Sequence, residues 1–215
     1  MIRKARTIKT GKRLLRHERG FTLVEMLVAI FIFSMVMLIA VGALLSMVDA
    51  NRKAQTIKSA VNNLSFALDG MSRAIRVGTT FHCGTSGDAT NASVLSSAAN
   101  CGANGGTLIS FESYGGNSSN PADQWVYCQG TGTTCNAAGT SILRSEDGGA
   151  SYQSITSPEV IVQDLHFYVV GALTGAADRY QPKIVMVLHG FAGTNEKTKT
   201  ELRLETTMTP RLLDE

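Results

Sequence analysis

Residues 19–48 read RGFTLVEMLVAIFIFSMVMLIAVGALLSMV, and their order sets the architecture of the whole 215-residue chain. A basic leader ends at Gly20, and an uninterrupted apolar segment follows at once, with one carboxylate, Glu25, at its fifth position. A secretory signal has the opposite order, because its cleavage site comes after the apolar segment. The sequence therefore predicts a cleavage site placed before a hydrophobic helix, so that the helix remains in the mature protein.

The charge of the chain is divided unequally between the leader and the rest. Residues 1–20 carry eight Lys and Arg against one Glu, a net charge of +7, whereas residues 21–215 carry twelve Lys and Arg against sixteen Asp and Glu, a net charge of −4. The formal net charge of +3 therefore comes from the leader. Because the body is acidic, no direct binding of nucleic acid is expected.

Residues 21–48 are long enough to cross a membrane. As a helix they would span about 42 Å, against about 30 Å for the hydrocarbon core of a bilayer. The basic leader predicts a single pass with the N-terminus cytoplasmic and the C-terminal part extracytoplasmic. A cleaved secretory signal is disfavoured, because the apolar run is about twice the usual length and Val48-Asp49-Ala50 is a poor cleavage site. An uncleaved anchor would explain the length and orientation, but neither the Gly20–Phe21 junction nor Glu25.

The helical pattern continues through residues 49–77 and becomes one-sided. Its apolar residues are spaced by three and four, which predicts an amphipathic helix with one buried stripe. Gly78 is the expected end of this helix. The pattern is too short to favour a coiled coil, so packing on the chain's own sheet is expected. The stripe consists of Ile57, Val61, Leu64, Leu68, Met71 and Ile75.

Residues 78–215 are expected to form an extracytoplasmic β-sheet domain. Residues 78–106 are rich in Gly, Ser, Thr, Asn and Ala, and this composition predicts a long polar surface loop. Strand-like runs then recur with turn signals between them, which indicates an antiparallel sheet after a helix, an α+β fold. The expected strands are Thr107–Glu112, Gln124–Gln129, Ser141–Arg144, Tyr152–Ile155, Val160–Val170, Lys183–His189 and Glu201–Met208.

All four cysteines follow the apolar segment, at Cys83, Cys101, Cys128 and Cys135. Four cysteines allow three pairings. We favour Cys83–Cys101 and Cys128–Cys135, because each pair closes a local loop in a polar, turn-rich stretch. An oxidising compartment outside the inner membrane would permit both disulfides. A metal site is disfavoured, because no C-x-x-C or C-x-x-H spacing occurs.

The Gly-Phe-Thr-Leu-Val-Glu sequence at residues 20–25, followed by the long apolar run, resembles the class III leader of type IV pilins and of the pseudopilins of type II secretion. The resemblance implies cleavage between Gly20 and Phe21 by a prepilin peptidase, and N-methylation of Phe21 by the same enzyme. It covers residues 1–77 and is only architectural beyond them. In the assembled state, Glu25 would meet the terminal amine of a neighbouring subunit, with snorkelling of Glu25 to the membrane interface as the simpler alternative.

The same resemblance implies the partners and the location. The partners would be the prepilin peptidase, other pilin or pseudopilin subunits, an inner-membrane assembly platform and the lipid bilayer. The protein would lie in the bacterial inner membrane and then in a pilus or pseudopilus. A 138-residue body suits a minor subunit, and residues 160–169 and 199–211 resemble J-type pseudopilins and W-type pilins, which are thought to sit at a filament tip. The mid-helix Pro of many major pilins is replaced here by Gly42 alone.

The sequence does not predict an enzyme, a metal or a cofactor. It contains no Ser/His/Asp nucleophile motif, phosphate-binding loop or paired catalytic carboxylates. An anchored adhesin or enzyme outside any filament stays as the alternative class. Four other kinds of site are disfavoured: metal binding by His82 with Cys83 and Asp88, metal binding or catalysis by His166 with His189, calcium at Asp123, Glu146 and Asp147, and a partner or sugar contact at Trp125 and Tyr127.

Overall fold

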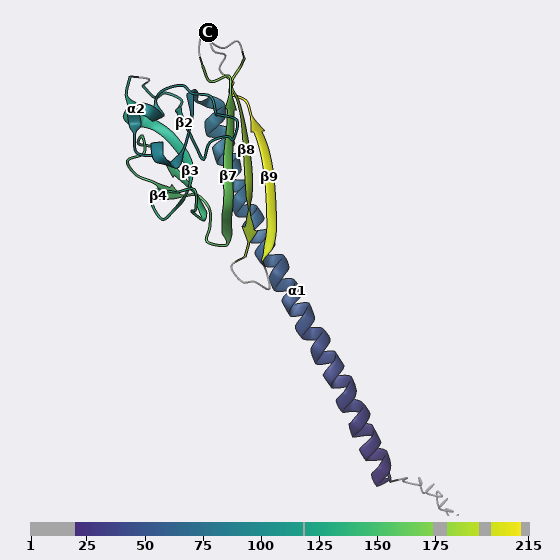
Figure 1. Cartoon of the computed structure of the whole chain (residues 1–215). Helices are drawn as coiled ribbons and strands as arrows, with labels where there is room; N and C mark the ends of the chain where they lie inside the picture. Colours follow the sequence, from purple (N-terminus) through teal and green to yellow (C-terminus); the bar gives the residue numbers. More distant parts are fainter. Residues whose placement is uncertain (1–19, 118, 174–179, 194–198, 212–215) are drawn as a thin grey trace, which may run out of the picture. The chain divides into compact units, whose positions relative to one another are not determined.

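The computed structural model describes residues 20–117, 119–173, 180–193 and 199–211 (Figure 1). The basic leader, apart from Gly20, lies outside the described residues. The chain divides into two compact units, Met1–Val48 and Asp49–Glu215.

Helix α1 comprises Leu23–Val77 and contributes to both units. In the first unit, every residue of α1 is exposed. In the second unit, one face of α1 is buried, at Ala60, Leu64, Ala67, Met71 and Ile75. The predicted stripe is therefore confirmed at Leu64, Met71 and Ile75. Its expected member Val61 is 42% exposed, because the buried face turns toward the alanines at positions 60 and 67.

In the described residues nine strands form two antiparallel sheets, where the sequence led us to expect one. The first sheet has the order β1-β2-β3-β5-β6, with β4 paired to β3, and the second has the order β7-β8-β9. The first contains β1 (Thr79–Gly84), β2 (Leu108–Glu112), β3 (Gln124–Thr131), β4 (Thr134–Cys135), β5 (Ser141–Ser145) and β6 (Gln153–Ser154). The second contains β7 (Val160–Val170), β8 (Lys183–Ala192) and β9 (Thr200–Met208).

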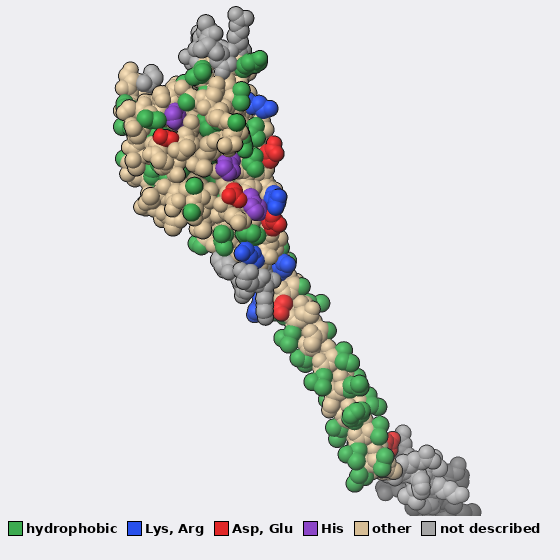
Figure 2. Space-filling model, viewed as in Figure 1, with side chains coloured by type: hydrophobic (Ala, Val, Ile, Leu, Met, Phe, Trp, Pro, Cys, Tyr) green, Lys and Arg blue, Asp and Glu red, His purple; other side chains and the backbone are tan. Residues whose placement is uncertain are grey.

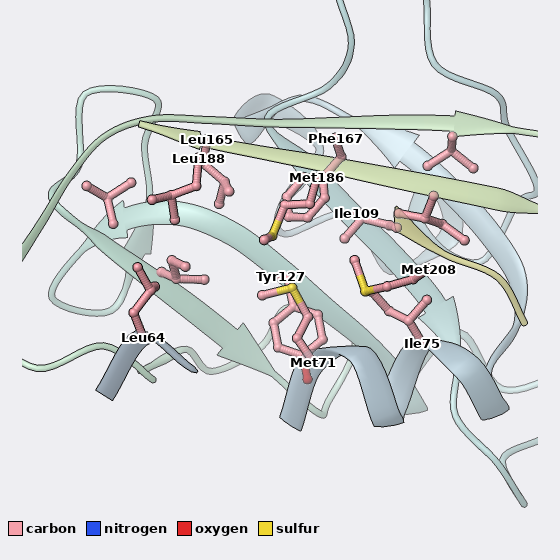
Figure 3. Close-up of a cluster of buried hydrophobic side chains, with 14 of the residues drawn as sticks. Leu64, Met71, Ile75, Ile109, Tyr127, Leu165, Phe167, Met186, Leu188 and Met208 are labelled. Atoms are coloured by element: carbon pink, nitrogen blue, oxygen red, sulfur yellow. The ribbon is translucent and has the colours of Figure 1, made fainter. Parts of the chain in front are cut away.

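The main core lies where the buried face of α1 meets both sheets. Figure 3 shows Leu64, Met71 and Ile75 on the helix, Tyr127 on β3 and Met186 on β8 in one cluster of buried side chains. Strand β8 alternates between this core and the outer face along its whole length, and β7 does so except at Gln163 and Asp164, where the register shifts. This alternation explains why their period-two pattern could be recognised in the sequence. The α+β architecture, a long N-terminal helix followed by an antiparallel β-domain, is therefore confirmed.

The expectation of a long polar loop at residues 78–106 is wrong. Residues 79–84 form β1, which pairs with β2, and two short helices follow, η1 (Ser86–Asp88) and α2 (Ala92–Leu95). Ala89 and Leu95 belong to a second buried cluster on the other side of the first sheet, with Leu108, Val126, Cys128, Cys135, Leu143 and Tyr152. The segment therefore covers a sheet face that would otherwise expose its apolar side chains.

Candidate processing and assembly site

The junction between Gly20 and Phe21 lies outside regular structure. Residues 20–22 are exposed and not helical, and α1 begins at Leu23, two residues later than the sequence suggested. A Cβ atom built on Gly20 would meet no other atom within 4 Å, and its backbone does not adopt a positive φ. Neither packing nor backbone conformation in the described residues therefore requires glycine at position 20.

Thr22 caps the start of α1. Its hydroxyl oxygen accepts a hydrogen bond from the backbone N–H of Glu25 (3.2 Å), and its carbonyl accepts one from the N–H of Met26 (3.2 Å). Ser or Thr followed three residues later by Glu is the signature of a helix capping box, in which the carboxylate can reach back to the N-terminal backbone. Sequence reasoning missed this role of Thr22, although the signal was present in the pattern TLVE.

Glu25 is the only charged residue between positions 21 and 48. It lies in the first turn of α1, where the partial positive charge of the helix N-terminus favours a carboxylate. It is exposed, and its carboxylate makes no hydrogen bond or ion pair with another described side chain.

The apolar side chains of α1 around Glu25 are also exposed. Leu23 and Leu38 are each 76% exposed, and Phe31 is 70% exposed. Figure 2 shows hydrophobic side chains along this part of the helix. A continuous apolar surface of this kind is far more than a soluble monomer usually exposes, and it indicates burial against lipid or other proteins. By length and composition the helix can cross a membrane.

Both disulfides lie in the β-domain. Cys83 on β1 pairs with Cys101, with their Cα atoms 5.0 Å apart, and Cys128 on β3 pairs with Cys135 on β4, at 5.8 Å. These are the two local pairs that the loop-closure argument favoured. The first ties the segment covering the sheet to β1, and the second closes the short β3–β4 connection.

The histidines named in the sequence analysis have other neighbours among the described residues than the predicted metal-binding partners. His189 lies between two carboxylates, with Nδ1 3.2 Å from Asp164 Oδ2 and Nε2 2.9 Å from Glu201 Oε1. Arg203 and then His189 lower the pKa of Glu201 by hydrogen bonding. His166 faces Val187 across the β7–β8 pair. His82 Nδ1 lies 2.8 Å from the carbonyl oxygen of Ser97.

The calcium group considered at Asp123, Glu146 and Asp147 is not assembled. Glu146 forms an ion pair with Arg144 (2.7 Å), and Asp147 accepts hydrogen bonds from the hydroxyls of Ser145 and Ser151. Among the described residues, no group of three or more His, Cys, Asp or Glu side chains is placed to hold a metal ion.

Trp125 and Tyr127 belong to the interior of the domain rather than to an open binding face. Tyr127 is 2% exposed, and burial raises its pKa to about 12. Trp125 is partly buried and stacks under Arg144, whose Cζ lies 5.3 Å from the ring centroid.

Asp88 accepts hydrogen bonds from the backbone N–H and the hydroxyl of Thr85, which stabilises the turn before η1.

The comparison with known families bears on this junction directly. Residues 15–41 match the prokaryotic N-terminal methylation motif, which is the class III prepilin leader of type IV pilins and pseudopilins. No curated protein and no solved structure matches the chain. The match is confined to these 27 residues, and it supports a type IV pilin-like protein that prepilin peptidase would process. This leader, together with the one helix in the described part of the chain that is long and apolar enough to span a membrane, fits anchoring in the inner membrane.

Proposed function

We propose that the protein is a minor pilin or pseudopilin. Prepilin peptidase cleaves it between Gly20 and Phe21 and methylates the new terminus, and the apolar half of α1 then enters a filament. The observation that carries this proposal is the apolar surface of residues 21–48, which is exposed along the helix and has Glu25 as its only charge. This segment lies at a match to the prepilin leader motif.

The local structure of the junction supports cleavage at Gly20–Phe21. A peptidase binds its substrate with the backbone extended, and Gly20 and Phe21 both precede Thr22, whose carbonyl accepts the first hydrogen bond of the helix, from the N–H of Met26. Because the chain's own fold does not require glycine at position 20, the glycine is explained by a close approach of another protein to the backbone.

Cleavage creates a positively charged α-amino group next to the first turn of an apolar helix. A carboxylate at the centre of a membrane helix costs roughly 2.5–3.5 kcal/mol. Pairing Glu25 of one subunit with the terminal amine of the next would offset the burial of both charges and fix the axial register between subunits. The capping geometry at Thr22 offers a second role for Glu25, stabilising the start of its own helix, and the two roles can be separated by experiment.

The rest of the chain is consistent with a subunit whose domain projects from the filament. The basic leader predicts that the N-terminus is cytoplasmic and that the β-domain is extracytoplasmic, where its two disulfides can form. Before assembly, lipid covers the apolar half of the helix, and afterwards neighbouring helices cover it, on an inner-membrane platform that drives the exchange. Ala29, Ser34, Ala40, Gly42 and Ala43 allow close approach between these helices.

A minor position, at or near a filament tip, is supported by the size of the body and by the resemblance of residues 160–169 and 199–211 to such subunits. The first range covers most of β7, and the second contains all of β9. The net charge of −4 on residues 21–215 speaks against direct DNA binding. A type II secretion pseudopilus and a type IV pilus use the same architecture, so the neighbouring genes discriminate between them.

The first test is cleavage. Co-expression of the full chain with an active prepilin peptidase should remove residues 1–20 and add a methyl group to Phe21, both measured by intact-mass spectrometry. Gly20→Val should block cleavage. Gly42→Ala is the matched control, because its added Cβ also meets no atom within 4 Å, and it should be processed normally. An unchanged mass of the wild-type chain would refute the proposal.

The second test separates the two roles of Glu25. Glu25→Ala should leave cleavage intact and abolish incorporation into filaments isolated by shearing. Thr22→Ala removes the capping hydroxyl, at a cost of about 1 kcal/mol to the helix end, and should reduce incorporation much less. Equal loss in both variants would mean that Glu25 acts through the cap and not through pairing between subunits. The alternative class, an anchored adhesin, predicts no dependence on the peptidase at all.

A further inference from the structure

Three oxygen-bearing side chains lie at the two ends of the connection between β2 and β3, two of them buried and the third, Asp123, half-buried. Glu112 ends β2 and is 4% exposed, and Gln124 begins β3 and is 1% exposed. The two residues face each other across the antiparallel pair. Asp123 directly precedes Gln124 and ends the short helix η2 (Pro121–Asp123).

Each of these three side chains has one buried oxygen without a hydrogen-bond partner: Glu112 Oε1, Asp123 Oδ1 and Gln124 Oε1. Their other polar atoms are engaged. Gln124 Nε2 donates to Glu112 Oε2, and the backbone N–H of Asn117 donates to Asp123 Oδ2 (2.9 Å). An unpaired buried polar group costs about 1–3 kcal/mol, and more when it is charged, so three in one place call for an explanation.

The two carboxylates contact the same turn. A Cβ atom on Gly116 would overlap Glu112 Oε1 and lie 3.1 Å from the carbonyl oxygen of Ser113, while the next residue, Asn117, donates to Asp123. The turn also requires glycine at position 115, where φ is +80°. Burial, and then the nearby charge of Asp123, raise the pKa of Glu112. The two acids therefore lie close enough to repel each other, with a backbone carbonyl beside them.

We propose that Glu112, Asp123 and Gln124 bind a calcium ion. Calcium takes carboxylate, amide and backbone carbonyl oxygens and tolerates irregular geometry, whereas magnesium requires a near-ideal octahedron. Zinc is disfavoured because no His or Cys belongs to this group. One cation satisfies all three orphaned oxygens and balances the two negative charges. A proton on Glu112 alone would leave at least one of the other two oxygens without a partner.

This site is separate from the pilin-like junction and from the turn at Glu146 and Asp147. A bound calcium ion would hold the β2–β3 connection against the ends of β2 and β3. This connection contacts α2, and Gln124 accepts a backbone hydrogen bond from Gly148. The consequence is a β-domain whose stability depends on the calcium concentration of its compartment.

The experiment uses the full chain in detergent micelles, stripped with EDTA and dialysed. Isothermal titration with CaCl₂ should give one bound ion per chain. At a free calcium concentration about 100 times Kd, the Tm of the β-domain should rise by roughly 5–10 °C. TbCl₃ should give luminescence sensitised by Trp125, the only tryptophan in the chain and the neighbour of Gln124. MgCl₂ should give less than about one tenth of the calcium effect at the same concentration.

Glu112→Gln and Asp123→Asn should each lower calcium affinity at least about tenfold and remove the Tm response. In EDTA they should unfold at or above the wild-type Tm, because each removes a repelling charge. Glu146→Gln is the matched control, since Glu146 is an exposed acid on a nearby turn, and it should bind normally. Gly116→Ala, which leaves both acids in place but displaces Glu112 Oε1, should also weaken binding.

Absence of calcium and terbium binding to the wild-type chain would overturn the proposal. So would full calcium binding in both acid variants, an equal loss of binding in Glu146→Gln, or an equal response to magnesium.

Discussion

The second half of α1 offers a matched pair of substitutions that tests how the helix packs in the β-domain. Leu64 is 1% exposed and lies in the main core, whereas Phe66, two residues later, is 85% exposed. Leu64→Ala removes three buried carbon atoms, which at about 0.8 kcal/mol each amounts to about 2.4 kcal/mol of lost transfer free energy. The cavity that remains brings the expected loss of unfolding free energy to about 3–5 kcal/mol.

Phe66→Ala removes a larger hydrophobic side chain, but from an exposed position. It should change the unfolding free energy by no more than about 0.5 kcal/mol. The order of the two effects is therefore the reverse of the order of side-chain size. Only the buried face of the helix explains such a reversal.

The assay is urea unfolding of the full chain in detergent micelles at neutral pH, followed by the fluorescence of Trp125. This residue is the only tryptophan and lies on β3, so the signal reports the β-domain. Equal slopes of unfolding free energy against urea in the two variants would show that the comparison is valid. A loss in Phe66→Ala as large as that in Leu64→Ala would refute the assignment of the buried helix face.

Three further outcomes are expected. Tyr152→Phe should cost about 1–3 kcal/mol in the same urea assay, because it leaves the buried carbonyl oxygen of Ala89, 2.5 Å from the tyrosine hydroxyl, without its donor. Replacing both Cys83 and Cys101 by Ala should lower the unfolding free energy by about 3 kcal/mol, because the disulfide restricts an unfolded loop of 18 residues. An unchanged urea midpoint would contradict this expectation. Hydrogen bonds from Ser151 and then from Ser145 lower the pKa of Asp147 in the folded protein below the ordinary value of 3.8. The wild type should therefore be more stable than Asp147→Asn above pH 3.8, and the difference should shrink as the pH falls further. Thermal unfolding between about pH 2 and about pH 6 measures it.

Much of the β-domain could be predicted because its local patterns are strong. Strand β7 has the predicted bounds Val160–Val170, and β8 extends the predicted strand by three residues, to Ala192. Both strands alternate between core and outer face, so their period was visible without tertiary information. The second half of helix α1 could be predicted in the same way, because its apolar residues are spaced by three and four positions.

The elements that sequence reasoning missed are those whose local signal is weak. Strand β1 reads TTFHCG and has Phe81 as its only large apolar residue, yet pairing with β2 makes it a strand and buries His82 at 7% exposure. The segment that follows was expected to be a loop, because its residues favour turns. It is ordered over the sheet by a few contacts, such as Leu95 in the second buried cluster and the carbonyl of Leu95 with the Ser110 hydroxyl (2.7 Å).

The order of residues along the chain was enough to predict the processing junction and to locate the apolar span and Glu25, because each of these depends on neighbouring positions along one segment. It also contained the capping signal at Thr22. The packing of the whole domain was needed to show that the strands form two sheets, which face of α1 is buried, and that Glu112, Asp123 and Gln124 each have an unpaired oxygen near the β2–β3 connection. Side chains eleven or twelve residues apart meet through strand register and turn geometry, and these are set by the packing of the whole domain.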